Sequence, residues 1–298
     1  MTTAPEQIRI LVGYDGSPHA SAAIDAGSAL FPEAHAWITH LWTPPFASEP
    51  LRRRLWTGTR HIDEFVEAVE REGEREAGRL AANGVTLARA AGWAAEPLVR
   101  RVYSGEGLQL GQLALEFDTD LILLGSRGLG GAKALLGSVS DMAVHYTPRP
   151  ALVVAHPLLL VEAAALPDGP VVVGWDGSAG ARHACAAARR LFPARELLLV
   201  SADPTGPEPA GVPEDVGGKV TLVHLDGPHR GSSSAVAEAL VTYARTQAAA
   251  VIAVGSRGRS AVREILLGSV AMATLHHSHR PVLVVPHEDV PTVEDLRL

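Results

Sequence analysis

The chain has 298 residues, of which 47% are hydrophobic and 5% aromatic, with a formal net charge of −7 and a pI near 6.0. This length suits two domains of roughly 150 residues, and the acidic balance argues against a nucleic-acid partner, which would need a clustered basic face. The single cysteine, Cys185, excludes an intramolecular disulfide and a multi-cysteine zinc site; no apolar run reaches the roughly 20 residues of a membrane span, so we expect a cytoplasmic protein.

The first half of the chain alternates apolar strand patterns with helix patterns. Ser17 is expected to cap a helix that has Pro18 at its first position. A later charged helix has an apolar stripe that includes Phe65, Val66 and Val69. The predicted strands are 9–14, 36–42, 97–102, 121–125 and 150–154, and the predicted helices are 18–30, 61–82, 108–117 and 138–145.

The second half repeats the first, with four motifs in the same order. This self-similarity indicates a duplication. The repeated motifs are ILVGYDGS at 10–17 and VVVGWDGS at 171–178, LILLGSRG at 121–128 and VIAVGSRG at 251–258, LLGSV at 135–139 and 266–270, and RPALVV at 149–154 with RPVLVV at 280–285.

The second copy is the shorter one. Its second and third strands are predicted at 197–202 and 219–225, and the Pro/Gly-rich segment 203–218 between them is too short for the long charged helix. We therefore predict domains at 1–156 and 170–290 with a linker at about 157–169. Apolar strands alternating with helices predict an α/β fold with two tandem doubly wound parallel sheets.

The GSRG and LLGS motifs have the features of an anion site. Gly255 ends a strand and Gly268-Ser269 opens a helix. Glycines let backbone N–H groups approach an anion, and a helix N-terminus adds its dipole and unpaired donors. Arg257 and Arg263 could neutralise phosphate charge. The alternative, that these glycines only make turns, is weakened by their recurrence in both copies.

An aspartate ends the first strand of each copy, Asp15 in GYDGS and Asp176 in GWDGS. Ligands of open α/β sheets bind at the carboxyl ends of strands, where this carboxylate would suit ribose hydroxyls or base N–H donors. Because it would repel phosphate, the phosphates should lie toward Gly128 and Gly137. An Asx-type turn would explain the same aspartate equally well.

These motifs resemble those of the universal stress protein family, over nearly the whole chain. The resemblance implies five-stranded domains of strand order 3-2-1-4-5, paired through their fifth strands as an internal pseudo-dimer. ATP-binding members use the Asp and the Gly/Ser loop for adenosine and phosphates, and strand-two backbone, here near Leu41 and Ala202, for adenine. The candidate site residues are Gly13, Asp15, Leu41, Gly125, Ser126, Arg127, Gly128, Gly137, Ser138, Val139 and Ser140 in the first copy, and Gly174, Asp176, Ala202, Gly255, Ser256, Arg257, Gly258, Arg263, Gly268, Ser269 and Val270 in the second.

The first copy departs from the family spacing. It has eight residues between Gly128 and Gly137, whereas the second copy has nine between Gly258 and Gly268. Gly130 and Gly131 in the shorter loop either compensate for the missing residue or disrupt the phosphate-binding geometry of the loop. Either copy could therefore be the nucleotide site.

Several catalytic motifs are missing from the sequence, namely GxxxxGK[ST], a helix-opening GxGxxG, GxSxG and HExxH. We predict no catalytic residue and no metal site, and we expect an ATP-binding regulator of stress adaptation, with or without Mg²⁺. Two alternatives stay open: a slow Mg²⁺-dependent ATPase or nucleotidyl-transfer enzyme using Asp15 or Asp176, and a nucleotide-free interaction module. The sequence identifies neither a signalling partner nor whether the chain forms a homodimer.

Overall fold

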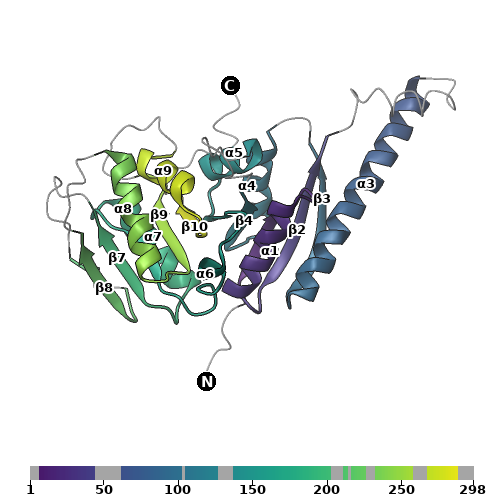
Figure 1. The fold of residues 1–298 in the computed structure, drawn as a ribbon. Coiled ribbons are helices and arrows are strands. Elements are labelled where there is room, and N and C mark those ends of the chain that lie inside the picture. Colours follow the sequence, from purple (N-terminus) through teal and green to yellow (C-terminus); the bar gives the residue numbers. More distant parts are fainter. Residues whose placement is uncertain are drawn as a thin grey trace.

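The computed structural model describes residues 7–43, 62–102, 105–126, 137–202, 211–213, 216–225, 232–257 and 267–287. Within these residues the chain forms one ten-stranded sheet, and its two halves lie side by side (Figure 1). The strand order is β3-β2-β1-β4-β5 in the first half and continues as β10-β9-β6-β7-β8 in the second. Each half thus has the order 3-2-1-4-5, which confirms the predicted doubly wound α/β fold.

The central strands are apolar and buried, whereas the edge strands β3 and β8 are partly exposed. The strand bounds are β1 Arg9–Gly13, β2 His35–Trp42, β3 Ala94–Arg101, β4 Leu121–Gly125, β5 Ala151–Val154, β6 Val171–Gly174, β7 Leu197–Ser201, β8 Val220–His224, β9 Val251–Gly255 and β10 Val282–Val285. All neighbours within a half are parallel. The two halves meet where β5 and β10 pair antiparallel, with Leu152 opposite Leu283.

Helices cover both faces of the sheet. Their bounds are α1 Pro18–Leu30, α3 Ile62–Ala90, α4 Glu106–Glu116, α5 Ser138–Tyr146, α6 Leu160–Ala163, α7 Ala179–Leu191, α8 Ser233–Thr246 and α9 Ser269–His277. On one face α1, α3 and α7 share a hydrophobic core, and on the other α4, α5, α8 and α9 pack. Burial on both faces explains why the central strands, such as β4 and β10, are continuously apolar rather than alternating.

Contacts between the halves extend beyond the sheet. The rings of Phe31 and Phe192, which follow α1 and α7, stack with centroids 5.1 Å apart. Arg190 in α7 also donates to the carboxylate of Asp120, which precedes β4, at 2.5 Å. The two copies therefore share one core as well as one sheet.

The first helix of each copy starts as its sequence predicts. The Ser17 hydroxyl accepts a hydrogen bond from the Ala20 N–H, and Ser178 does the same for Ala181, each at 3.2 Å. These side chains satisfy donors that would otherwise be unpaired at the helix start.

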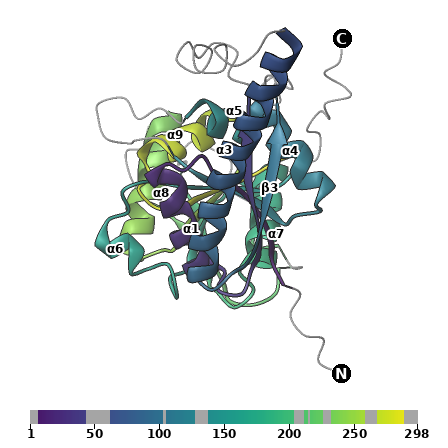
Figure 2. The same cartoon turned by 90° about the vertical axis from the view of Figure 1, so that its right-hand side faces the viewer.

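The long helix α3 corrects a prediction, because it ends at Ala90 rather than near residue 82. Its apolar stripe continues through the buried Val85 and Ala88, and Gly84 lets the helix approach the sheet. A Cβ at Gly84 would lie only 2.6 Å from Ile38. The helix runs lengthwise past β3 (Figure 2). The following strand starts at Ala94, three residues earlier than predicted.

The predicted linker 157–169 contains the short helix α6 and is held by hydrogen bonds from the half-buried Arg195. Arg195 donates to the carbonyls of Leu166, Pro167 and Gly169. Burial lowers the pKa of its guanidinium, and the nearby Asp168 opposes that shift. Arg280, which is 3% exposed, donates to the Ala249 carbonyl outside the linker; burial lowers the pKa of its guanidinium, and the charge of the nearby Glu162 in α6 opposes that shift. The segment between the copies is thus part of the packed structure.

Candidate functional site

Each half has a cavity at the carboxyl ends of its strands, between the first and fourth strand of the copy. The cavity volumes are about 250 Å³ in the second copy and about 240 Å³ in the first. The second cavity is lined by Gly174, Trp175, Asp176, Ser178, Ala181, Val200, Ala202, Val236, Leu240, Val254, Gly255, Arg257, Gly268, Ser269, Val270 and Ala271. The first is lined by Gly13, Tyr14, Asp15, Ser17, His19, Ala20, Thr39, His40, Leu41, Glu106, Leu110, Leu124, Gly125, Gly137, Val139 and Ser140.

The two DGS turns have the same geometry, and each places a carboxylate on the wall of its cavity. Asp15 accepts from the Ser17 N–H, and Asp176 accepts from the Ser178 N–H, each at 2.9 Å. The glycine between them adopts a left-handed conformation, with φ of 78° at Gly16 and 73° at Gly177. The aspartate thus forms an Asx-type turn and also lines a cavity, so the two interpretations of this residue are compatible.

A helix N-terminus faces each cavity from the other side. Gly268 and Gly137 are the N-cap residues of α9 and α5, and neither can offer a side-chain cap to the first-turn N–H groups. In the second copy Ser269, at the first position of α9, also lines the cavity, and its hydroxyl contacts that of Ser233 at 2.5 Å. Uncapped N–H donors and a helix dipole make this end of the cavity suitable for an anion.

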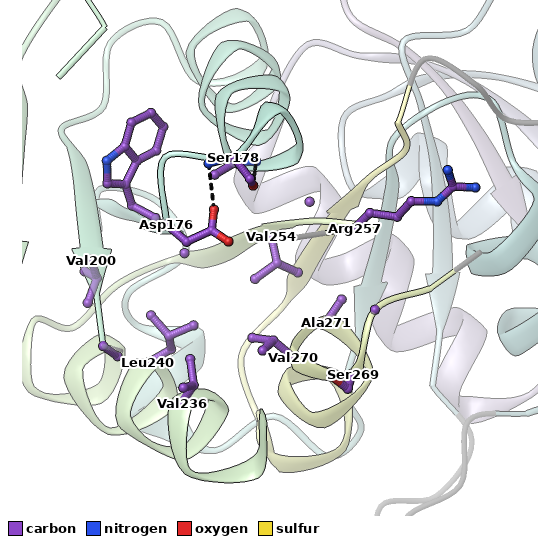
Figure 3. Close-up of a pocket in the computed structure, with 16 residues that line it drawn as sticks. Asp176, Ser178, Val200, Val236, Leu240, Val254, Arg257, Ser269, Val270 and Ala271 are labelled. Carbon is purple, nitrogen blue, oxygen red and sulfur yellow. Dashed lines mark hydrogen bonds between the residues drawn. The ribbon is translucent and has the colours of Figure 1, made fainter. Parts of the chain in front are cut away.

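The second cavity changes in polarity along its length (Figure 3). Val200, Val236 and Leu240 gather at one end, and Arg257 and Ser269 lie at the other. Asp176 lies between them on the cavity wall. The Arg257 Nε is buried without a hydrogen-bond partner among the described residues. Such a cavity can take a ligand with an apolar ring, hydroxyl donors in the middle and a negatively charged end.

Most of the predicted site residues come together at these cavities. In the first copy they are Gly13, Asp15, Leu41, Gly125, Gly137, Val139 and Ser140, and in the second Gly174, Asp176, Ala202, Gly255, Arg257, Gly268, Ser269 and Val270. Leu41 and Ala202 occupy the strand-two position expected for adenine. The Ser140 hydroxyl donates a hydrogen bond to the Gly125 carbonyl and so connects α5 to the end of β4.

Two predicted serines lie behind the cavities rather than in their walls. Ser256 is buried, and its hydroxyl accepts from the His287 N–H at 3.1 Å. Ser126 is 2% exposed, and its hydroxyl has no partner among the described residues. The predictions at Arg127, Gly128, Gly258 and Arg263, and at the Ser138 side chain, lie outside what the structure describes.

Sequence reasoning missed the wall that the helix after the third strand contributes. Glu106 and Leu110 of α4 line the first cavity, and Val236 and Leu240 of α8 line the second. Both helices follow a parallel strand, so their first turns necessarily start at the same sheet edge as the site. That topological signal could have identified them. His40 of β2 also lines the first cavity, and its Nδ1 lies 2.8 Å from the Tyr14 carbonyl oxygen.

Two further observations concern the residues that the structure describes. These residues contain no group of three or more His, Cys, Asp or Glu side chains that could hold a metal ion. None of the described helices combines the length and apolarity required to cross a membrane. Cys185 is fully buried within the core shared by α1, α3 and α7.

Comparison with known proteins agrees with this architecture. The universal stress protein family matches residues 8–155 and 229–286. A universal stress protein of Mycobacterium tuberculosis is 27% identical over 309 residues, covering 95% of this chain and 99% of the relative. One from Thermus aquaticus is 32% identical over 155 residues, covering 49% of this chain and 96% of the relative. A solved universal stress protein structure from Archaeoglobus fulgidus has the same fold, with a TM-score of 0.62 and 19% identity over 93% of this chain and 98% of that one. The chain belongs to the universal stress protein family.

Proposed function

We propose that this protein is an ATP-binding regulator of stress adaptation with little or no catalytic turnover. It acts in the cytoplasm by binding adenine nucleotide at the carboxyl ends of its strands. The two predicted domains, 1–156 and 170–290, act as an internal pseudo-dimer joined through β5 and β10. A homodimer of the whole chain is an additional level of assembly compatible with this proposal.

The observation that carries the proposal is the polarity of the second cavity. Adenine would lie among Val200, Val236 and Leu240, since aromatic bases favour apolar walls. The Asp176 carboxylate would accept from the ribose hydroxyls. The phosphates would then lie toward Arg257 and the N-terminus of α9, where helix dipole and unpaired N–H donors favour negative charge.

The expectation of little turnover rests on the chemistry of the lining. Phosphoryl transfer with Mg²⁺ normally requires carboxylates that hold the metal and a group that orients the nucleophile. In the second cavity the described lining has one carboxylate, that of Asp176. It has no histidine, lysine or second acid beside it to serve as a general base.

Ligand-dependent unfolding tests this proposal. Mg-ATP at 100 times its Kd should stabilise the wild-type chain by about 2.7 kcal/mol, measured as a rise in Tm. Asp176→Asn keeps an oxygen for the Ser178 N–H but removes the charge. Since a hydrogen bond to a charged group contributes roughly 1.5–3 kcal/mol, its ATP affinity should fall about tenfold or more. Asp15→Asn tests whether the first copy contributes to this ATP-dependent stabilisation.

A matched control and a turnover assay complete the experiment. Asp118→Asn changes an exposed carboxylate at the opposite end of β4, bonded to Arg9 and Arg149, and should leave ATP binding unchanged. No rise in Tm with wild type, and no nucleotide retained through purification, would instead favour the nucleotide-free interaction module. Phosphate release that Asp176→Asn abolishes would favour the slow ATPase.

A further inference from the structure

The two cavities differ at one position of the wall that α4 and α8 provide. Glu106 in α4 and Val236 in α8 each stand four residues before the leucine, Leu110 or Leu240, that lines the same cavity. They are thus equivalent positions in the two copies. The second strand shows a related change, because Thr39 in the first copy replaces Val200 in the second.

The location of Val236 shows which end of the ligand this position faces. Val236 lies with Val200 and Leu240 at the apolar end of the second cavity, away from Arg257 and Ser269 (Figure 3). By equivalence, Glu106 brings a carboxylate to the base end of the first cavity, not to its phosphate end. This acid lies in the first turn of α4, is half-buried and has no partner among the described residues.

A carboxylate at the base end discriminates between purines. An ionised carboxylate only accepts hydrogen bonds and has two oxygens that can take two parallel donors. Guanine presents adjacent N1–H and N2–H₂ donors on one edge. Adenine presents a single amino donor next to the N1 lone pair, which a carboxylate repels. Hypoxanthine presents N1–H alone.

We propose that Glu106 makes the first copy selective for a guanine base, whereas the second copy, with Val236, takes adenine. This inference rests on the proposed nucleotide-binding function and deepens it. The chain then carries two sites for two purine ligands. The glutamate binds the two N–H donors of guanine while Leu41, Leu110 and Leu124 pack around the ring.

The charges of the described linings are consistent with different ligands. The first cavity has two carboxylates, Asp15 and Glu106, and its described lining has no lysine or arginine. The second has Asp176 together with Arg257. Monophosphates are therefore the suitable probes, because they compare bases at a low and constant ligand charge.

Calorimetric titration of GMP, IMP and AMP tests the inference on the full chain saturated with ATP. GMP should bind about 10- to 100-fold more tightly than AMP, the range of a good bidentate pair, with IMP between them. Glu106→Val should abolish this preference. Val236→Glu should create a second GMP-selective site and weaken ATP. Glu116→Val, which changes an exposed acid at the other end of α4 that is paired with Arg100, should leave the preference unchanged.

The outcomes separate this inference from the proposed function. Equal GMP and AMP affinities, or a GMP preference that survives Glu106→Val in a variant with unchanged Tm, would overturn the guanine assignment. Stabilisation by ATP that depends on Asp176 would still stand in that case. If no nucleotide binds to either copy, the proposed function fails and the guanine assignment fails with it.

Discussion

A single position in the first helix of each copy shows how closely the backbone packs at the site. A Cβ on Gly180 in α7 would lie 1.9 Å from the carbonyl oxygen of Arg257. The absence of a side chain at Gly180 therefore lets the end of the GSRG segment lie against α7. The equivalent residue in the first copy is His19, whose side chain lines the cavity and whose ring contacts that of His156 edge-on.

We expect Gly180→Ala to disturb the second site selectively. Backbone atoms must shift to admit the methyl group, and overpacking of this kind typically costs about 1–3 kcal/mol of unfolding free energy. ATP affinity at the second copy should fall as Arg257 moves. Urea denaturation and calorimetry measure the two effects.

Gly78→Ala is the matched control for this substitution. Gly78 lies inside α3, and nothing is within 4 Å of its added Cβ. Alanine should stabilise the helix by roughly 0.5–1 kcal/mol and leave ATP affinity unchanged. Equal effects of both substitutions on stability and binding would contradict the packing argument.

At the scale of single elements, β8 is held at its start by one acid. The Glu196 carboxylate accepts from Lys219 at 2.7 Å and from Thr221 at 3.0 Å. The hydrogen bond from Lys219 lowers the pKa of Glu196 below its ordinary value of 4.5, and Thr221 lowers it further, while burial opposes both. This edge strand thus depends on an ionised glutamate.

This shift predicts a pH dependence of known sign. Because the folded pKa lies below the unfolded one, the stabilisation is complete above pH 4.5 and is lost as the pH falls through the folded pKa. Glu196→Gln should be less stable than wild type at neutral pH by roughly 0.2–1 kcal/mol. The gap should close in acid. Urea denaturation from pH 6 to 3 measures it, and a gap that widens in acid would refute the assignment.

Element boundaries show how much of the fold the sequence could predict. The helix at Pro18–Leu30 and the strand at Leu121–Gly125 were predicted with their observed bounds, since a capping serine and flanking glycines mark them. For the long helix α3, the sequence predicts an end near residue 82, eight residues before the observed end at Ala90. Asn83 and Gly84 are poor helix formers, and tertiary packing explains why the helix continues, because Gly84 lies close to Ile38 and Val85 is buried.

The site was predictable where backbone chemistry defines it. The aspartates and glycines identified the strand ends and helix starts because these residue types serve turns and anion sites directly. The side walls were predictable only as elements: topology places the starts of α4 and α8 at the site, but the rotation of each helix about its axis decides that Glu106 and Val236 reach the cavities. That rotation is set by tertiary packing of Leu110 and Leu240.

At the scale of the whole molecule, the two halves should stay together without a covalent link. The pairing of β5 with β10, the Phe31–Phe192 stack and the Arg190–Asp120 ion pair do not involve the linker. Leu160 and Val161 in α6 are 90% and 63% exposed. A protease site inserted between them should be cleaved in the folded protein.

The cut chain should then elute from a gel-filtration column at the volume of the intact one. The fragments should separate only in denaturant. Fragments that separate under native conditions at micromolar concentration would show that the linker, rather than the shared sheet and core, holds the halves together. Uncut protein with the same insertion is the control.

The antiparallel junction of β5 and β10 also decides how the two cavities can influence each other. Strands β4, β5, β10 and β9 lie between them, so at about 4.8 Å per strand the bound ligands would be roughly 19 Å apart along the sheet. Because β5 and β10 are antiparallel, the strands of the two halves also have their carboxyl ends at opposite ends of the sheet. Direct contact between ligands is excluded, and any cooperativity must pass through four close-packed central strands as a coupling free energy felt equally at both sites. Such a molecule is suited to sense the concentrations of two ligands at once, rather than to respond cooperatively to the concentration of one ligand.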